Sequence, residues 1–76
     1  MQILPRASMR NVRTLREAIQ GKWINIIVGG IAMFADPRKV LRVSRGEGSL
    51  GQENYRLTLK EANTFLVDAN STIQLY

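Results

Sequence analysis

The run from Trp23 to Ala35 is the longest apolar stretch of the chain, and a pair of glycines, Gly29 and Gly30, interrupts it. Its first half is rich in β-branched residues, which are typical of strands. A Gly-Gly pair readily adopts the positive φ angles of a two-residue turn, so the run predicts a hairpin with strands at 23–28 and 31–35. The first strand is apolar on both faces. A sheet containing it must therefore be covered on both sides, either by helices or by a second copy of the chain.

A helix is predicted before this hairpin, over residues 9–20. Ser8 is a suitable N-cap, and Gly21 supplies the residue that follows the helix. One side of the helix is basic, and the opposite side carries an apolar stripe that we expect to pack on the sheet. This stripe consists of Val12, Leu15 and Ile19.

Alternating polar and apolar residues predict two further strands, at 39–45 and 54–58. In the first of these, Leu41 and Val43 are expected to share one face. The segment between the strands, 46–52, contains a literal G-x-G-x-x-G pattern. Because a strand follows it, rather than the helix that a dinucleotide site requires, we interpret this segment as a hairpin loop.

The last quarter of the chain predicts a second helix and a short strand. Thr58 and Glu61 match a capping box, in which the first residue caps the helix and the second reaches back to it. Asn70 is expected to end this helix, and residues 72–76 to form a final strand. The apolar positions at helical spacing are Leu59, Ala62, Leu66 and Ala69.

These elements predict one small basic α+β domain over residues 1–76, in the order α-β-β-β-β-α-β. We expect a mainly antiparallel sheet of four or five strands with two helices packed against it. The predicted core consists of Val12, Leu15, Ile19, Ile24, Ile26, Val28, Phe34, Leu41, Val43, Leu57, Leu66 and Ile73.

The composition argues against most enzymatic chemistry. The chain contains no cysteine and no histidine, which excludes thiolate nucleophiles, imidazole bases, and zinc or haem sites that need these ligands. The six acidic residues are scattered along the chain. We therefore expect a protein that is not an enzyme and that holds no cofactor and no metal.

The sequence also favours a cytoplasmic protein without a membrane partner. A helix needs about 20 apolar residues to span a bilayer, and the run at 23–35 is shorter and contains Asn25. The first six residues lack the apolar stretch of a signal peptide.

The charges are distributed unevenly, with nine of the eleven basic residues in the first 45 positions against two acids there. A positive field of this kind attracts polyanions or acidic proteins. Arginine also suits phosphate groups, which it binds with two parallel hydrogen bonds. If helix 9–20 and strand 39–45 face the same way, their charges form one stripe suited to a nucleic-acid backbone. The candidate phosphate-contacting residues are Arg10, Arg13, Arg16, Arg38, Lys39, Arg42 and Arg45.

Two functions fit these observations. The first is a small nucleic-acid-binding or regulatory protein without catalytic activity. The alternative is a protein–protein interaction module, such as an inhibitor, adaptor or small subunit, which docks on an acidic partner or assembles with itself through its sheet. Trp23 and Tyr55 are of the type that stacks on unpaired bases, but strand alternation predicts that both face the core. A chain this short has a small core, so we expect a homodimer or larger assembly.

Overall fold

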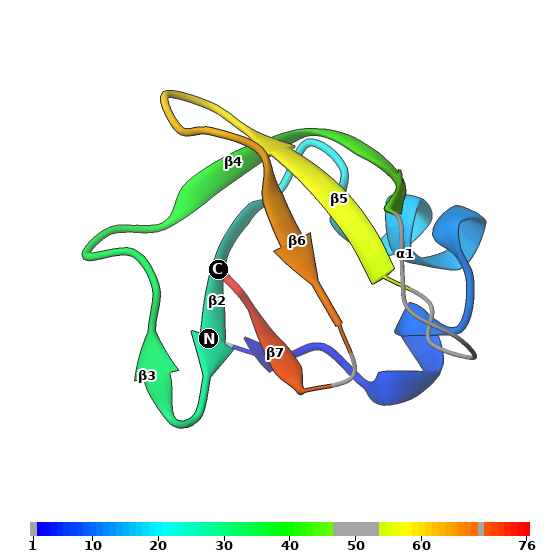
Figure 1. Ribbon diagram of the computed structural model, residues 1–76, viewed down its shortest axis with the longest axis horizontal. Helices are drawn as coiled ribbons and strands as arrows, with labels where there is room; N and C mark the ends of the chain where they lie inside the picture. The colour runs from blue at the N-terminus through cyan, green and yellow to red at the C-terminus, as the bar shows by residue number, and fades with distance from the viewer. Residues whose placement is uncertain (1, 47–53, 69) are drawn as a thin grey trace.

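The computed structural model is an α+β fold with a mainly antiparallel open sheet, and it describes residues 2–46, 54–68 and 70–76. These ranges contain seven strands, one α-helix and one 3-10 helix (Figure 1). In chain order the elements are β1 (Gln2–Ile3), the 3-10 helix η1 (Arg6–Met9), α1 (Val12–Ile19), β2 (Trp23–Val28), β3 (Ile31–Ala32), β4 (Arg38–Gly46), β5 (Asn54–Leu59), β6 (Phe65–Val67) and β7 (Ser71–Leu75).

The strands follow the order β1-β7-β2-β4-β5-β6, with β3 paired to the end of β2, and every pair is antiparallel. The final strand, predicted at 72–76, thus lies between β1 and β2. β2 and β4 are in register only at Trp23–Lys39 and Ile24–Arg38. This short junction links two halves of the sheet, β1-β7-β2 and β4-β5-β6. Both halves contribute side chains to one core.

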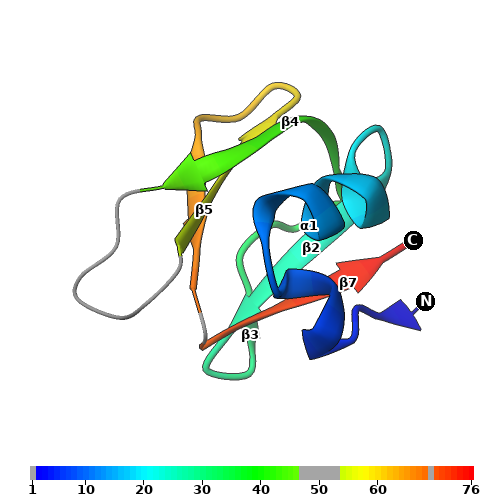
Figure 2. The same ribbon diagram turned by 90° about the vertical axis from the view of Figure 1, so that its right-hand side faces the viewer.

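α1 lies beside β4 and contributes its two buried residues to the core (Figure 2). The structure confirms seven of the predicted core residues as buried, and Val12 and Phe34 pack against the core while partly buried. Val28, Leu41 and Leu66 were predicted inside and are exposed. Buried apolar residues that are absent from the predicted core list are Leu4, Val40, Tyr55, Leu59 and Val67.

The helix begins later than predicted, and Ser8 is not its cap. Asn11 has extended backbone angles, and its side-chain Oδ1 accepts a hydrogen bond from the Thr14 backbone N–H at 2.8 Å. Asn11 is therefore the N-cap. Ser8 instead lies in η1. Because α1 begins at Val12, Arg10 precedes the helix. The end of the helix is as predicted, since Gly21 follows the C-cap residue with a φ of +80°.

The central hairpin is confirmed, but its second strand is only two residues long. Gly29 and Gly30 have φ angles of +59° and +80°, as a turn of this length requires. Beyond Ala32, the side chain of Asn25 replaces a strand partner. Its Nδ2 donates to the Phe34 carbonyl at 2.8 Å, and its Oδ1 accepts from the Phe34 N–H at 3.2 Å.

A β-bulge in β4 reverses the predicted facing of Leu41. Val40 pairs with Leu59, and Arg42 pairs with Thr58, so Leu41 is an extra residue between consecutive partners. Val40 and Val43 both face the core as a result, while Leu41 is 49% exposed.

The second predicted helix is wrong, because the chain forms two strands there. Thr58 and Leu59 end β5, and Glu61 adopts a left-handed φ of +58° in the turn that follows. β6 then pairs with β5, placing Phe65 opposite Leu57. Ala69 and the 47–51 part of the G-x-G-x-x-G pattern lie outside the described residues.

The two candidate stacking residues differ in their exposure. Tyr55 is 2% exposed, as predicted, and its hydroxyl donates to the Met9 carbonyl at 2.9 Å. Trp23 was also expected in the core, but it is 48% exposed because it lies where β2 begins, at the junction of the two halves of the sheet.

Candidate functional site

α1 lies against the edge of β4, with Arg16 at the contact. β2 covers that edge only at Arg38 and Lys39, and no other strand in the described ranges pairs with the rest of it. The Gly21 N–H donates to the Val40 carbonyl, and the Val40 N–H donates to the Lys22 carbonyl. Further along, the Arg16 guanidinium donates from its Nη2 to the Val43 carbonyl at 3.1 Å. The helix and the strand, which are distant in sequence, are therefore neighbours on the surface.

Four arginines gather around this contact and form what we term the β4 basic cluster: Arg16, Arg42, Arg45 and Arg56. All four are exposed. Arg42 and Arg45 are three residues apart on β4, so they occupy opposite faces of the strand, and Arg16 reaches its edge between them. Arg56 comes from β5 and pairs with Ser44. The cluster therefore surrounds one stretch of β4 with positive charge.

The other two predicted residues of the N-terminal part are Arg13 and Arg10. Arg13 projects from the exposed side of α1, where its Nε lies 3.5 Å from a carboxylate oxygen of Glu17. Both side chains are largely exposed, and such a pair contributes little stability. Arg10 follows Met9, whose carbonyl accepts the hydrogen bond from the Tyr55 hydroxyl. Tyr55 in turn pairs with Arg45 between β5 and β4. Arg10 is therefore at the same end of β4 as Arg45.

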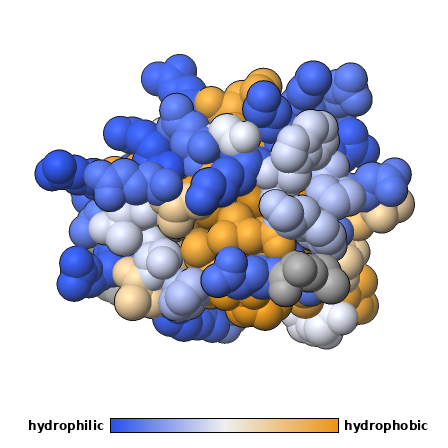
Figure 3. Space-filling view, turned by 180° about the vertical axis from the view of Figure 1, so that it is seen from behind, coloured by the Kyte–Doolittle hydropathy of each residue, from blue (hydrophilic) through white to orange (hydrophobic). Residues whose placement is uncertain are grey.

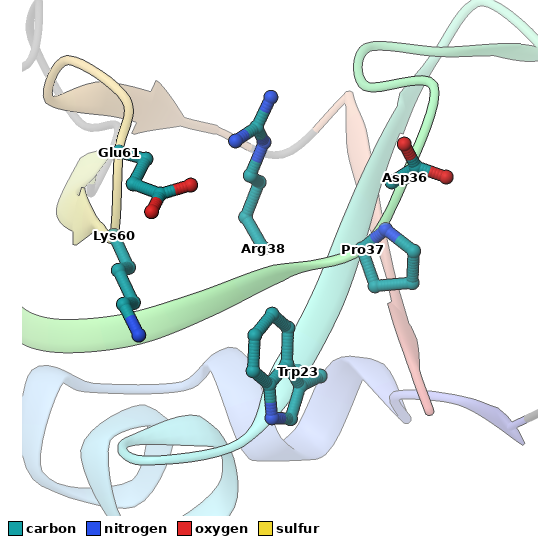
Figure 4. Close-up of a pocket in the computed structure, with 6 residues that line it drawn as sticks. All are labelled: Trp23, Asp36, Pro37, Arg38, Lys60 and Glu61. Atoms are coloured by element: carbon teal, nitrogen blue, oxygen red, sulfur yellow. The ribbon is translucent and has the colours of Figure 1, made fainter.

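Arg38 and Lys39 lie at the opposite end of β4. Arg45 is seven positions beyond Arg38, which corresponds to roughly 20 Å along a strand. Of the seven predicted residues, Arg10 and Arg45 thus lie at one end of β4, Arg38 and Lys39 at the other, and Arg16 and Arg42 near its middle, while Arg13 projects from α1. At the Arg38 end the surface is hollowed into a cavity of about 260 Å³ (Figure 4). Its lining residues are Trp23, Asp36, Pro37, Arg38, Lys60 and Glu61.

The charged groups around this cavity are close together without forming ion pairs. In Figure 4 the Glu61 carboxylate points from the β5–β6 turn toward Arg38. Among the described residues the one ion pair within 4.0 Å is that of Arg13, so neither Arg38 nor Lys60 is paired with a carboxylate. The Arg38 guanidinium lies 5.8 Å from the centre of the Phe34 ring, and its Nε is buried without a hydrogen-bond partner.

Six residues of these two sites are absent from the site residues predicted from the sequence: Arg56, Trp23, Asp36, Pro37, Lys60 and Glu61. The alternation in strand 54–58 already placed Arg56 on the outward face, but this arginine falls in the acidic half of the chain. Lys60 was assigned to a helix that does not form. Trp23 was assigned to the core, and no signal in the sequence indicates its exposure.

In the described ranges no group of three acidic residues is placed to hold a metal ion, and no helix is long and apolar enough to cross a bilayer. No protein-family model matches the chain, and no curated protein or solved structure matches it.

Proposed function

We propose that the protein binds the phosphate backbone of a nucleic acid through the β4 basic cluster, in a binding or regulatory role without catalysis. The observation that supports this most directly is the hydrogen bond from Arg16 to the Val43 carbonyl. It brings Arg16 of α1 to the edge of β4, between Arg42 and Arg45. A contiguous group of arginines is what recognition of a charged backbone requires.

The electrostatics of the cluster agree with this function. Arg42, Arg45 and Arg56 form no ion pair with the acidic residues that the structure describes. Their guanidinium groups are therefore available to form bidentate hydrogen bonds with phosphate oxygens. The formal net charge of +5 adds a long-range attraction to a polyanion.

Salt dependence tests this function, because phosphate contacts release counterions. With about four contacts, the logarithm of the affinity for duplex DNA should fall against the logarithm of salt concentration with a slope of about −3.6. The double variant Arg42→Ser/Arg45→Ser should reduce the magnitude of this slope by about 1.8. The matched control, Arg6→Ser/Arg13→Ser, removes the same charge outside the cluster and should leave the slope largely unchanged.

Fluorescence anisotropy of a labelled duplex between ~50 and ~200 mM salt measures both slopes. Affinity that does not change with salt would contradict the function. Equal losses in the two double variants would contradict the assignment to the β4 basic cluster.

A second candidate function is protein binding, and the exposed apolar residues of the central hairpin favour it. Val28, Ile31 and Met33 are 37%, 66% and 39% exposed. Figure 3 shows apolar surface across the middle and lower part of the molecule seen from behind. A pull-down tests this candidate: recovery of one stoichiometric protein that resists nuclease treatment supports it, and recovery of nucleic acid alone contradicts it.

A further inference from the structure

The cavity at the start of β4 combines three chemical features that one ligand must match. The exposed indole of Trp23 offers an apolar, aromatic surface. Arg38 and Lys60 offer donors with positive charge, and Asp36 and Glu61 offer acceptors with negative charge. These cations and carboxylates are not paired with each other, so each can still bind a ligand group. The cavity of about 260 Å³ has room for one small molecule.

Backbone strain at Glu61 is an independent indication that this turn has a role beyond the fold. A side chain other than glycine in the left-handed region costs on the order of 1 kcal/mol, and glycine or asparagine would occupy the position more favourably. Such strain is concentrated at binding sites. Here the strained residue directs its carboxylate across the cavity toward Arg38 (Figure 4).

We propose that this cavity binds a single unpaired nucleotide. The base packs against Trp23, the Glu61 carboxylate accepts hydrogen bonds from the edge of the base, and Lys60 binds the phosphate. Base stacking on an exposed aromatic side chain is a recurring mode of single-strand recognition. Because a carboxylate only accepts hydrogen bonds, Glu61 favours guanine, whose edge carries adjacent N–H donors, over adenine.

This inference deepens the proposed nucleic-acid function and rests on it, since an unpaired nucleotide in the cavity belongs to a strand whose backbone continues along β4. Arg38, which lines the cavity, and Lys39, the next residue of β4 toward the β4 basic cluster, were both predicted as phosphate contacts. A strand bound along β4 would pass these two residues. The preferred partner would then be a single strand with an accessible guanine.

The chain contains one tryptophan, so intrinsic fluorescence reports directly on the cavity. Titration with guanosine monophosphate should quench the Trp23 emission saturably, and adenosine monophosphate should bind more weakly. Ribose 5-phosphate, which lacks a base, should not quench. Lys60→Gln should weaken binding of both nucleotides about tenfold, as expected for the loss of a charge-assisted contact. Glu61→Gln should remove the preference for guanine.

Arg6→Gln is the control, because it removes a cation from the exposed η1 and should leave the titration unchanged. Absence of saturable quenching by either nucleotide would overturn the proposal, as would wild-type titrations in both Lys60→Gln and Glu61→Gln. Saturable quenching by arginine amide in place of the nucleotides would assign the cavity to a cationic peptide and would also overturn it. Duplex binding measured on the same samples separates the two proposals. Salt-dependent duplex binding without nucleotide quenching overturns the proposal for the cavity and leaves the proposed nucleic-acid function standing.

Discussion

At the scale of single residues, Asn25 decides how the central hairpin ends. It interrupts an apolar run, which the sequence shows, but the reason for its position is visible only in three dimensions. Its side chain is buried, at 4% exposure, and it hydrogen-bonds both backbone groups of Phe34. Its Oδ1 also accepts from the Ile26 N–H at 2.8 Å. One amide thus replaces the strand partner that β3 is too short to provide.

Asn25→Ala should lower the free energy of unfolding by about 2–3 kcal/mol, because it leaves buried backbone groups of Phe34 and Ile26 without partners. Asn25→Asp should also destabilise the protein, since a carboxylate cannot donate to the Phe34 carbonyl. Urea denaturation measures both changes. Thr14→Ala removes a hydroxyl that bonds to Asn11 at the helix start and is the control for loss of a partly buried polar group. If Asn25→Ala were no more damaging than this control, the amide would not anchor the hairpin.

At the scale of elements, alternation in the sequence predicts where strands lie better than which way their residues face. The strand predicted at 39–45 exists, but the bulge at Leu41 shifts the alternation by one residue. Val40 therefore faces the core, and Leu41 faces solvent. Nothing local in the sequence marks the bulge, because it depends on how β4 pairs with β5.

Paired alanine substitutions test this register. Val43→Ala should lower the free energy of unfolding by about 2 kcal/mol, since its side chain is fully buried. Leu41→Ala should change it by less than about 0.5 kcal/mol, because the leucine is 49% exposed. Thermal or urea unfolding of the two variants provides the comparison. A larger loss for Leu41→Ala than for Val43→Ala would mean that β4 lacks the bulge.

The false prediction of a second helix has the same origin. Thr58 and Glu61 fit a capping box, and the apolar residues that follow fit a helical spacing. In the structure, pairing across strands outweighs these local signals, because Phe65 and Val67 pack opposite Leu57 and Tyr55. The spacing of apolar residues within one segment does not show which other segment will pair with it. The first helix was predicted because its apolar stripe and its terminating glycine are both local features.

At the scale of the whole molecule, the charge asymmetry was predictable, and the division of the cations between two sites was not. The charges counted in the sequence predict a positive field, and this prediction requires no coordinates. Placing the candidate residues requires the packing of α1 on β4, which brings Arg16 to Arg42 and Arg45 and leaves Arg38 at the cavity. Arg56 joins the cluster only through the pairing of β4 with β5.

Net charge and exposed apolar surface together predict how the protein self-associates. Two copies with a formal charge of +5 repel each other, and salt screens this repulsion. The apolar residues of the central hairpin favour contact between copies once repulsion is screened, and Ile31, at 66% exposure, is the most exposed of them. Self-association should therefore strengthen as salt increases, whereas binding to a nucleic-acid backbone should weaken.

Sedimentation velocity at several protein concentrations should accordingly show a dimer fraction that is larger at ~500 mM than at ~50 mM salt, because the Debye length falls over this range. Ile31→Ser should reduce the dimer fraction at high salt, since it removes the most exposed apolar side chain of the hairpin. Leu41→Ser removes an exposed leucine of β4 and should leave the dimer unchanged. Monomer at every salt concentration would exclude assembly through the hairpin, and a dimer that dissociates as salt rises would indicate an interface between charged groups instead.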